Sequence, residues 1–288
     1  MLRLVALLVT AGVACVAYGI AIERSWYRLR RYDLAILPPG GPARLAVLHL
    51  SDLHFVRADR KKARFLASLP PADITVVTGD FLAEPAAVET AVAAVRSVRG
   101  SSASWFVLGS NDHYAPMPLN YLAYFRKRRK RRFALRGRAD DLIRGLVTDG
   151  WTDLTNVRDL VDVDGLQIEL LGLDDAHLGW HDLRIAPRRA PERLGVAVMH
   201  SPDPAPESAA LGYDLLVAGH THGGQVCIPG IGALVTNSSM PRRLASGLIR
   251  MGSAVLHTSP GLGTSKYAPF RFGCRPEATL LELRPRPG

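Results

Sequence analysis

The chain has 288 residues, of which 48% are apolar and 22% charged, so it can bury a core and is not globally disordered. Its formal charge of +10 favours an anionic partner such as nucleic acid, a phosphorylated metabolite or lipid headgroups, without choosing among them. Its three cysteines, Cys15, Cys227 and Cys274, exclude a disulfide framework and are too far apart in the sequence for a paired-cysteine zinc site.

The N-terminal region contains a candidate membrane span. From Leu4 to Ile22, nineteen consecutive residues carry no charge. At about 1.5 Å per helical residue they cover about 28 Å, close to the ~30 Å thickness of a hydrocarbon core. We therefore expect residues 1–22 to form a transmembrane anchor, with a cleavable signal peptide as the alternative. Four arginines follow the run and only Arg3 precedes it, which places the body of the protein in the cytoplasm.

The next segment is rich in basic residues, proline and glycine. The stretch PPGGP at 38–42 can neither continue a helix nor pair as a central strand. Residues 23–43 are therefore expected to be a linker, followed by one domain over 44–284 and a tail over 285–288.

Six short apolar runs in this domain have the length of buried strands. Between the second and third runs, Val88, Ala91, Val92 and Val95 recur at helical spacing. Strands that alternate with helices indicate an α/β protein. The runs are 45–50, 74–78, 105–108, 167–171, 196–199 and 215–218.

Chemically active side chains directly follow five of these runs. Ligands bind α/β sheets at the carboxyl ends of their strands, so the five clusters could converge. Each motif alone is weak, but together they offer only nitrogen and oxygen donors, which suit two divalent ions of the manganese, iron or zinc type. The clusters are SDLH with Asp52 and His54, TGD with Gly79 and Asp80, GSNDH with Asn111, Asp112 and His113, MHSPDP with His200, and GHTHGGQ with Gly219, His220, His222, Gly223 and Gly224.

This ordered set resembles the calcineurin-like metallophosphoesterase family, whose pattern is D-x-H, G-D, G-N-H-D/E, a single His and G-H-x-H. The resemblance extends from about Leu45 to Leu283, and the GHTHGGQ and SPGLGTS stretches are similar to the membrane-linked bacterial branch. It implies a two-sheet β-sandwich flanked by helices, a four-layer fold with a dinuclear metal centre on one edge.

The same resemblance implies a division of the metal ligands. Asp80 would bridge two divalent ions, with manganese expected and zinc or iron as alternatives. A shared carboxylate can hold two cations about 3.5–4 Å apart, so that an activated water attacks phosphorus without a protein nucleophile. The ligands of one ion would be Asp52, His54, Asp80 and His222, and those of the other Asp80, Asn111, His200 and His220.

One position departs from the family pattern. The family places a His directly after the ligating Asn, whereas here Asp112 separates Asn111 from His113. We expect His113 to be the catalytic group that contacts phosphate and assists the leaving group. The alternatives are that Asp112 orients a neighbouring imidazole or that solvent protonates the leaving group. Further candidates for supporting roles are Asp174, Asp175, His177, His257 and the loop from Gly261 to Ser265.

The segment RKRRKRR at 126–132 carries seven positive charges. It could be a solvated face, a nucleic-acid contact or a surface for anionic lipid. We expect an anionic membrane surface, because the chain already has a candidate anchor and each basic residue near such a surface contributes about 1 kcal/mol. Few aromatic residues that could stack on bases flank the segment.

The sequence thus predicts a membrane-anchored, metal-dependent phosphoesterase. The scissile bond would be a phosphodiester or a pyrophosphate, with a lipid or cell-envelope metabolite as one candidate substrate and monoester hydrolysis left open. The alternatives are a scaffold that binds metal without turnover, because a fold does not guarantee its chemistry, and a nuclease.

Overall fold

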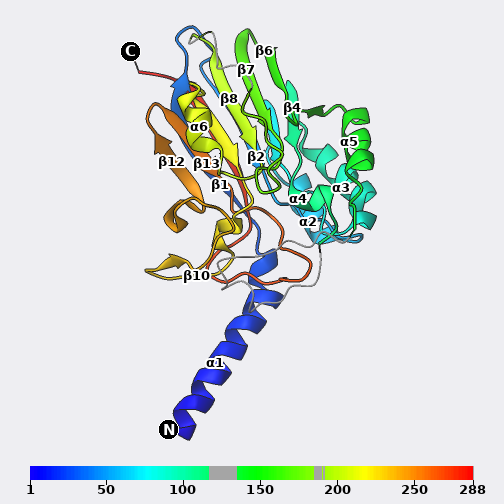
Figure 1. Ribbon diagram of the computed structural model, residues 1–288, viewed down its shortest axis with the longest axis vertical. Helices are drawn as coiled ribbons and strands as arrows, with labels where there is room; N and C mark the ends of the chain where they lie inside the picture. The colour runs from blue at the N-terminus through cyan, green and yellow to red at the C-terminus, as the bar shows by residue number, and fades with distance from the viewer. Residues whose placement is uncertain (117–134, 185–189, 191, 288) are drawn as a thin grey trace.

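The body of the protein is a sandwich of two six-stranded mixed sheets with helices on its outer faces (Figure 1). A computed structural model describes residues 1–116, 135–184, 190 and 192–287. The basic segment 126–132 lies outside these residues, so its predicted membrane contact stays a prediction. The four-layer fold that the family resemblance implied is confirmed.

The first sheet has the strand order β1-β14-β2-β3-β4-β5. The predicted strands at 45–50, 74–78 and 105–108 are its β2, β3 and β4. The bounds are β1 Arg28–Leu37, β2 Leu45–Leu50, β3 Ile74–Thr78, β4 Ala103–Val107, β5 Thr152–Asp153 and β14 Glu277–Pro285.

The second sheet has the order β12-β13-β9-β8-β7-β6, and a separate two-stranded hairpin consists of β10 and β11. The three remaining predicted strands are β7, β8 and β9. The bounds are β6 Arg158–Val163, β7 Leu166–Leu173, β8 Leu194–Met199, β9 Leu215–Ala218, β10 Cys227–Ile228, β11 Gly232–Ala233, β12 Gly247–Met251 and β13 Ala254–Thr258.

Six α-helices and several single 3-10 turns accompany the sheets in the described ranges. The α-helices are α1 Leu2–Ala21, α2 Arg60–Ala67, α3 Val88–Val95, α4 Ser110–His113, α5 Ala139–Thr148 and α6 Ala205–Ala210. The 3-10 turns are Glu23–Ser25, Pro85–Ala87, Arg96–Val98, His222–Gly224 and Arg242–Leu244.

Three apolar clusters hold these layers together. One lies between the sheets and joins β2–β4 to β7–β9. The second fills the space between the first sheet and helices α2, α3 and α5, and includes the predicted helical positions Val88, Ala91 and Val95. The third lies under α6 on the second sheet. Because both faces of each sheet are covered, the central strands consist mostly of apolar residues.

The segment predicted as a linker contributes a strand, which corrects that prediction. Residues 28–37 form β1, which pairs in parallel with β14 at the edge of the first sheet. Its arginines face solvent or the buried Glu277, whose Oε2 accepts hydrogen bonds from Arg28 Nε at 2.7 Å and Arg30 Nε at 3.0 Å. Basic residues are therefore compatible with an edge strand here. Only the turn around Gly40, whose φ is 81°, links strands as expected.

Helix α1 projects from one end of the domain (Figure 1). The segment Arg3–Ser25 is long and apolar enough to cross a membrane, with a mean hydropathy of 2.3, and little of it is buried. Its last turns contact the domain. Gly19 O accepts a hydrogen bond from Arg271 N at 3.4 Å, and the rings of Tyr18 and Phe272 lie 6.3 Å apart. These two contacts hold the last turns of α1 against the domain.

Strand directions place the functional edge at the same end of the domain. β1 starts beside the end of α1, β14 is parallel to β1, and β2 is antiparallel to β14. β3 and β4 are parallel to β2. The carboxyl ends of β2, β3 and β4 therefore lie at the end of the domain from which α1 emerges (Figure 1).

Candidate metal centre

Loops from both sheets meet at the carboxyl ends of the central strands. Within the first sheet, Asp52 N donates to Gly79 O at 3.0 Å and His54 N donates to Asp80 O at 2.9 Å. Between the sheets, His220 N donates to Oδ2 of Asp52 at 2.9 Å. These bonds bring together side chains that are far apart in the sequence, as the motif order predicted.

The first group of candidate ligands surrounds His54. Nε2 of His54 lies 3.3 Å from Nε2 of His222, and Nε2 of His222 lies 3.5 Å from Oδ1 of Asp52. Oδ2 of Asp80 is 3.5 Å from the same His54 nitrogen. Donor atoms of Asp52, His54 and His222 all lie within 4.8 Å of one another, a spacing that suits one cation.

The second group surrounds His200. Nε2 of His200 lies 3.6 Å from Oδ2 of Asp80 and 3.2 Å from Nδ1 of His220. The Asn111 side-chain amide is 2.5 Å from that Asp80 oxygen, and the alternative amide orientation would present its oxygen instead. Asp52, Asp80 and His200 also form a group within 4.8 Å. Oδ2 of Asp80 therefore lies between the two groups.

The donor set fits divalent cations. Asp52, His54, Asp80, His200 and His220 are all buried. Oδ1 of Asp52 and Nδ1 of His54 have no hydrogen-bond partner among the described residues. Two carboxylates buried beside facing imidazole nitrogens need a compensating positive charge, and oxygen and nitrogen donors without thiolate favour ions of the manganese, zinc or iron type.

Backbone carbonyls fix the tautomers of two histidines. Nδ1 of His200 lies 2.7 Å from Thr78 O, and Nε2 of His220 lies 3.2 Å from Asn237 O. Because a carbonyl oxygen only accepts, each of these nitrogens carries the proton. The opposite nitrogen of each ring, which faces the cluster, is then free to bind a metal.

The cluster also shifts the pKa of its members. Burial holds the pKa of His54 below its ordinary value and lowers that of His222 to about 3, so both imidazoles stay neutral near pH 7. Burial alone would raise the pKa of Asp80, but the positive charge of His200 and the hydrogen bonds from Asn111 hold it well below its usual range.

Burial would lower the pKa of His200, but the charges of Asp80, Asp175 and Asp52 raise it to about 9. A cation would therefore displace a proton from His200, whereas His54 and His222 already have the neutral form that metal binding requires.

The backbone at the ligands adopts an uncommon conformation. Asp52, His54, Asp80, His220 and His222 have φ values between 44° and 67°, in the left-handed region that few non-glycine residues occupy. Such strain persists where surrounding contacts enforce it and concentrates at functional sites. Gly219 precedes His220, and a Cβ at Gly219 would collide with Ser51 Oγ and Asp52 Oδ2. That glycine is required by this close approach.

His113 lies beside the loop that follows β7. Its Nε2 is 3.1 Å from Oδ1 of Asp174, and its ring packs against Trp180 with centroids 4.8 Å apart. Burial would lower the pKa of His113, but the hydrogen bond and charge of Asp174 raise it above its ordinary value. Asp174, for which we expected a supporting role, therefore contacts His113 directly. Trp180 was not predicted from the sequence, because an aromatic residue in a loop carries no specific signal.

Asp112 has a structural contact of its own. It is fully buried, and its two carboxylate oxygens accept hydrogen bonds from Gly109 N at 3.0 Å and Leu82 N at 3.1 Å. Burial, together with the charge of Asp80, raises the pKa of Asp112 to about 7. These contacts stabilise the turn that presents Asn111.

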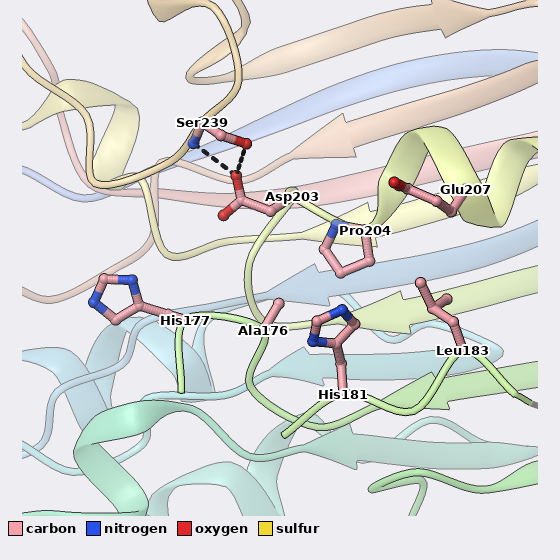
Figure 2. Close-up of a pocket in the computed structure, with 8 residues that line it drawn as sticks. All are labelled: Ala176, His177, His181, Leu183, Asp203, Pro204, Glu207 and Ser239. Atoms are coloured by element: carbon pink, nitrogen blue, oxygen red, sulfur yellow. Dashed lines mark hydrogen bonds between the residues drawn. The ribbon is translucent and has the colours of Figure 1, made fainter. Parts of the chain in front are cut away.

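A cavity of about 270 Å³ lies between the loop that follows β7 and the start of α6 (Figure 2). His177 and His181 line one side, and Pro204 and Glu207 of the α6 region line the other. The His177 ring lies 4.5 Å from the His220 ring, measured between centroids. The candidate residue His177 therefore connects the cavity to the metal centre.

A hydrogen-bonded turn supports the Asn237 carbonyl. Oδ1 of Asp203 accepts hydrogen bonds from Ser239 N at 2.7 Å and from Ser239 Oγ at 2.5 Å (Figure 2). Asn237 lies two positions before Ser239, and its carbonyl oxygen contacts His220. Neither Asp203 nor Asn237 was found from the sequence, because a backbone carbonyl contact leaves no mark on residue type.

Arg271 is a further contributor that the sequence did not reveal. Its side chain is fully buried, and one terminal nitrogen donates to Pro260 O at 2.7 Å and Gly263 O at 2.6 Å. The same nitrogen lies 3.5 Å from Nδ1 of His222. Arg271 thus joins the SPGLGTS loop to a candidate ligand.

Three sequence candidates remain. Asp175 is buried, and its Oδ1 accepts a hydrogen bond from His177 N at 2.6 Å. Gly263 N donates to Asp52 O at 2.6 Å, so the loop from Gly261 to Ser265 packs directly against the ligand loop. His257 instead lies between the two sheets, where its Nδ1 is 2.7 Å from Nδ1 of His49. The structure therefore places His257 in the interior of the sandwich, away from the two ligand groups described above.

A family model and several relatives of known sequence match this chain. A family model described as calcineurin-like phosphoesterase matches residues 45–224. The chain is 28% identical over 242 residues to the uncharacterized metallophosphoesterase YkuE of Bacillus subtilis, covering 82% of this chain and 76% of the relative. It is 27% identical over 267 residues to the phosphodiesterase YaeI of Escherichia coli, covering 91% and 90%. It is 26% identical over 264 residues to a transmembrane protein with metallophosphoesterase domain of Bos taurus, covering 87% and 55%.

Proposed function

This chain belongs to the calcineurin-like phosphoesterase family and is a metal-dependent phosphoester hydrolase, and we propose that α1 anchors it in a membrane, where it cleaves a phosphodiester or pyrophosphate bond. One observation carries the proposed dinuclear site. Oδ2 of Asp80 lies 3.5 Å from a ring nitrogen of His54 and 3.6 Å from one of His200. A carboxylate oxygen placed between two donor groups suits a bridge between two cations.

We assign the seven candidate ligands to two cation sites that share Asp80. When bound, the two cations would supply Lewis acidity for the phosphoryl oxygens and an activated water as the nucleophile. The protein contributes orientation through Thr78 O and Asn237 O, which direct His200 and His220. The sites would comprise Asp52, His54, Asp80 and His222 on one side, and Asp80, Asn111, His200 and His220 on the other.

We assign proton donation to His113. Its contact with Asp174 stabilises the protonated imidazole, which can then give a proton to the departing oxygen. Asp112 is proposed to act indirectly by holding the turn that carries Asn111 and His113.

The donor set supports manganese, zinc or iron, and manganese is our choice because carboxylate and amide oxygens accompany the imidazoles. A diester substrate agrees with the relative from Escherichia coli that is named a phosphodiesterase. The arginines that follow α1 favour a cytoplasmic position for the domain.

The test uses the full-length protein in detergent, stripped of metal and then supplied with manganese, zinc, iron or magnesium. Soluble diester, pyrophosphate, monoester and nucleic-acid substrates are compared for the parent and for Asp80→Asn. We expect one metal to restore diester or pyrophosphate hydrolysis, and Asp80→Asn to lower it by about 1,000-fold or more.

The matched control is Asp159→Asn, because Asp159 is an exposed carboxylate on β6. It should retain parental activity. Parental activity in Asp80→Asn would refute the bridging role, and cleavage of nucleic acid without cleavage of small diesters would favour a nuclease.

A further inference from the structure

The small hairpin β10–β11 exposes apolar side chains. Its strands pair Cys227 with Ala233 and Ile228 with Gly232. The exposed fractions of the side chains at and near its tip are 38% for Ile228, 69% for Ile231 and 38% for Leu234. We call Ile228, Ile231 and Leu234 the hairpin patch. An apolar group of this kind on a domain surface points to an interaction site.

The hairpin is joined to the last turns of α1 by a short series of contacts. Cys227 N donates to Phe272 O at 2.7 Å. The Phe272 ring lies 6.3 Å from that of Tyr18, and Arg271 N donates to Gly19 O at 3.4 Å. Because Tyr18 and Gly19 belong to the apolar helix, the base of the hairpin lies level with the end of that helix (Figure 1).

Residues suited to a membrane interface lie at the same level. Trp26 is 50% exposed, and the Arg275 guanidinium lies 3.9 Å from the centre of its ring. Lys61 Nζ donates to Ser25 Oγ at 2.8 Å, and Arg24 is exposed beside it. Tryptophan and basic side chains concentrate where a transmembrane helix leaves the hydrocarbon layer.

The junction between α1 and the domain is closely packed. Glu23 is only 3% exposed, and its Oε1 accepts a hydrogen bond from Cys274 N at 2.7 Å. A Cβ at Gly19 would lie 2.6 Å from Arg271 O, so no larger residue fits without a shift. The direction of α1 therefore determines which face of the domain meets the bilayer.

We propose that the hairpin patch inserts into the headgroup layer of the same leaflet from which α1 emerges, so that the bilayer is its partner. This inference rests on the anchoring part of the proposed function. Lipid rather than protein is the partner because the patch is joined to an apolar helix and accompanied by Trp26 and basic side chains. The candidate ligand His222 precedes β10 by five residues, so docking would hold the metal-binding edge next to the headgroups.

The test measures the depth of the hairpin patch in a bilayer. Full-length Ile231→Cys is labelled with a fluorophore and reconstituted into phosphatidylcholine vesicles that contain phosphatidylglycerol and a lipid with a nitroxide near the headgroup. The control is Leu160→Cys on β6, because Leu160 is 45% exposed and β6 lies at the far end of the domain (Figure 1). Labelled parent protein corrects for Cys15, Cys227 and Cys274.

We expect nitroxide quenching at position 231 to exceed that at position 160 several-fold. Leu234→Cys provides the same measurement should Ile231→Cys fail to fold. Equal quenching at the patch and at position 160 in vesicle-bound protein would overturn the docking proposal alone. Release of the parent from vesicles by an alkaline wash would instead refute anchoring, and with it both proposals. Hydrolysis is not needed for either readout.

Discussion

Nε2 of His113 and Oδ1 of Asp174 lie 3.1 Å apart and connect helix α4 at the end of the first sheet to the loop that follows β7 in the second. This pair predicts how the reaction depends on the leaving group. His113→Ala should slow hydrolysis of alkyl diesters by about 100-fold, because a poor leaving group needs a proton, but reduce p-nitrophenyl diester hydrolysis only a few-fold.

The measurement is kcat/KM across a series of diesters. Asp174→Asn should show a weaker dependence on the leaving group of the same kind. The control is Asp182→Asn, which should not show it, because the Asp182 carboxylate pairs with Arg184 at the surface. An equal loss for every leaving group would show that His113 does not act as an acid.

Metal binding should stabilise the folded protein. Because the donor groups assemble only in the folded chain, a cation at 100 times its dissociation constant should add about 2.7 kcal/mol to the free energy of unfolding. We expect manganese to raise the melting temperature of the stripped protein, and this rise to be much smaller in Asp80→Asn. Thermal unfolding with and without manganese provides the check, with Asp159→Asn as the control. An unchanged rise in Asp80→Asn would contradict the assigned bridge.

The buried pair His49 and His257 predicts how stability depends on pH. Burial lowers the pKa of His257 to about 3 and that of His49 well below its ordinary 6.5. With Nδ1 atoms 2.7 Å apart, one ring donates and the other accepts, so the accepting ring must be neutral, and burial keeps the donating ring neutral as well. The unfolded chain gains protons below about pH 6.5 and the folded chain does not, so stability is present above that pH and lost as pH falls.

At pH 5 the loss should be about 2 kcal/mol for each histidine. His257→Gln keeps a hydrogen-bonding side chain but cannot titrate. The difference in free energy of unfolding between His257→Gln and the parent should therefore shift in favour of the variant by about 2 kcal/mol when the pH falls from 8 to 5. Urea unfolding at both pH values measures this difference, and His181→Gln, in a partly exposed histidine, serves as the control. A parallel decline in parent and His257→Gln would refute the prediction.

Arg271 should be intolerant even of lysine. One terminal nitrogen of its planar guanidinium donates to the carbonyls of Pro260 and Gly263, and the other donates to Cys274 O at 3.3 Å. A single ammonium group cannot reach carbonyls on both sides in this way. We expect Arg271→Lys to lower the free energy of unfolding by about 2 kcal/mol, the cost of buried carbonyls left unpaired. Manganese affinity should also fall, because the guanidinium adjoins His222.

Chemical unfolding and metal titration measure the two effects. Arg250→Lys, at an exposed position of β12, is the matched control and should change neither. Parental stability in Arg271→Lys would show that the buried fork is not needed.

The central strands and the candidate ligands were predictable from the sequence because both leave local patterns. β2, β3, β8 and β9 are mostly apolar runs, since both of their faces are covered, and the polar exceptions are His49 in β2 and two threonines in β3. Their ends carry Asp52, Asp80, His200 and His220, residue types that are costly to bury without a role.

The outer parts of the fold were not predictable in the same way. β1 is half exposed and carries arginines whose partner, Glu277, lies about 250 positions away. A contact of this kind depends on tertiary packing, which overrides local propensity. The contacts of Asn237 O with His220 and of Arg271 with His222 could not be predicted either. They form only on folding, and residue type does not indicate which distant group a carbonyl or a guanidinium will contact.

The register of β1 has a consequence for proteolytic release of the domain. Arg28 to Leu37 align with Glu277 to Pro285, and α1 ends at Ala21. Cleavage that freed a soluble enzyme would have to fall within residues 22–27. A cut after residue 43 would remove the outermost strand and uncover the hydrogen-bonding edge of β14, which would then be open to association with other chains.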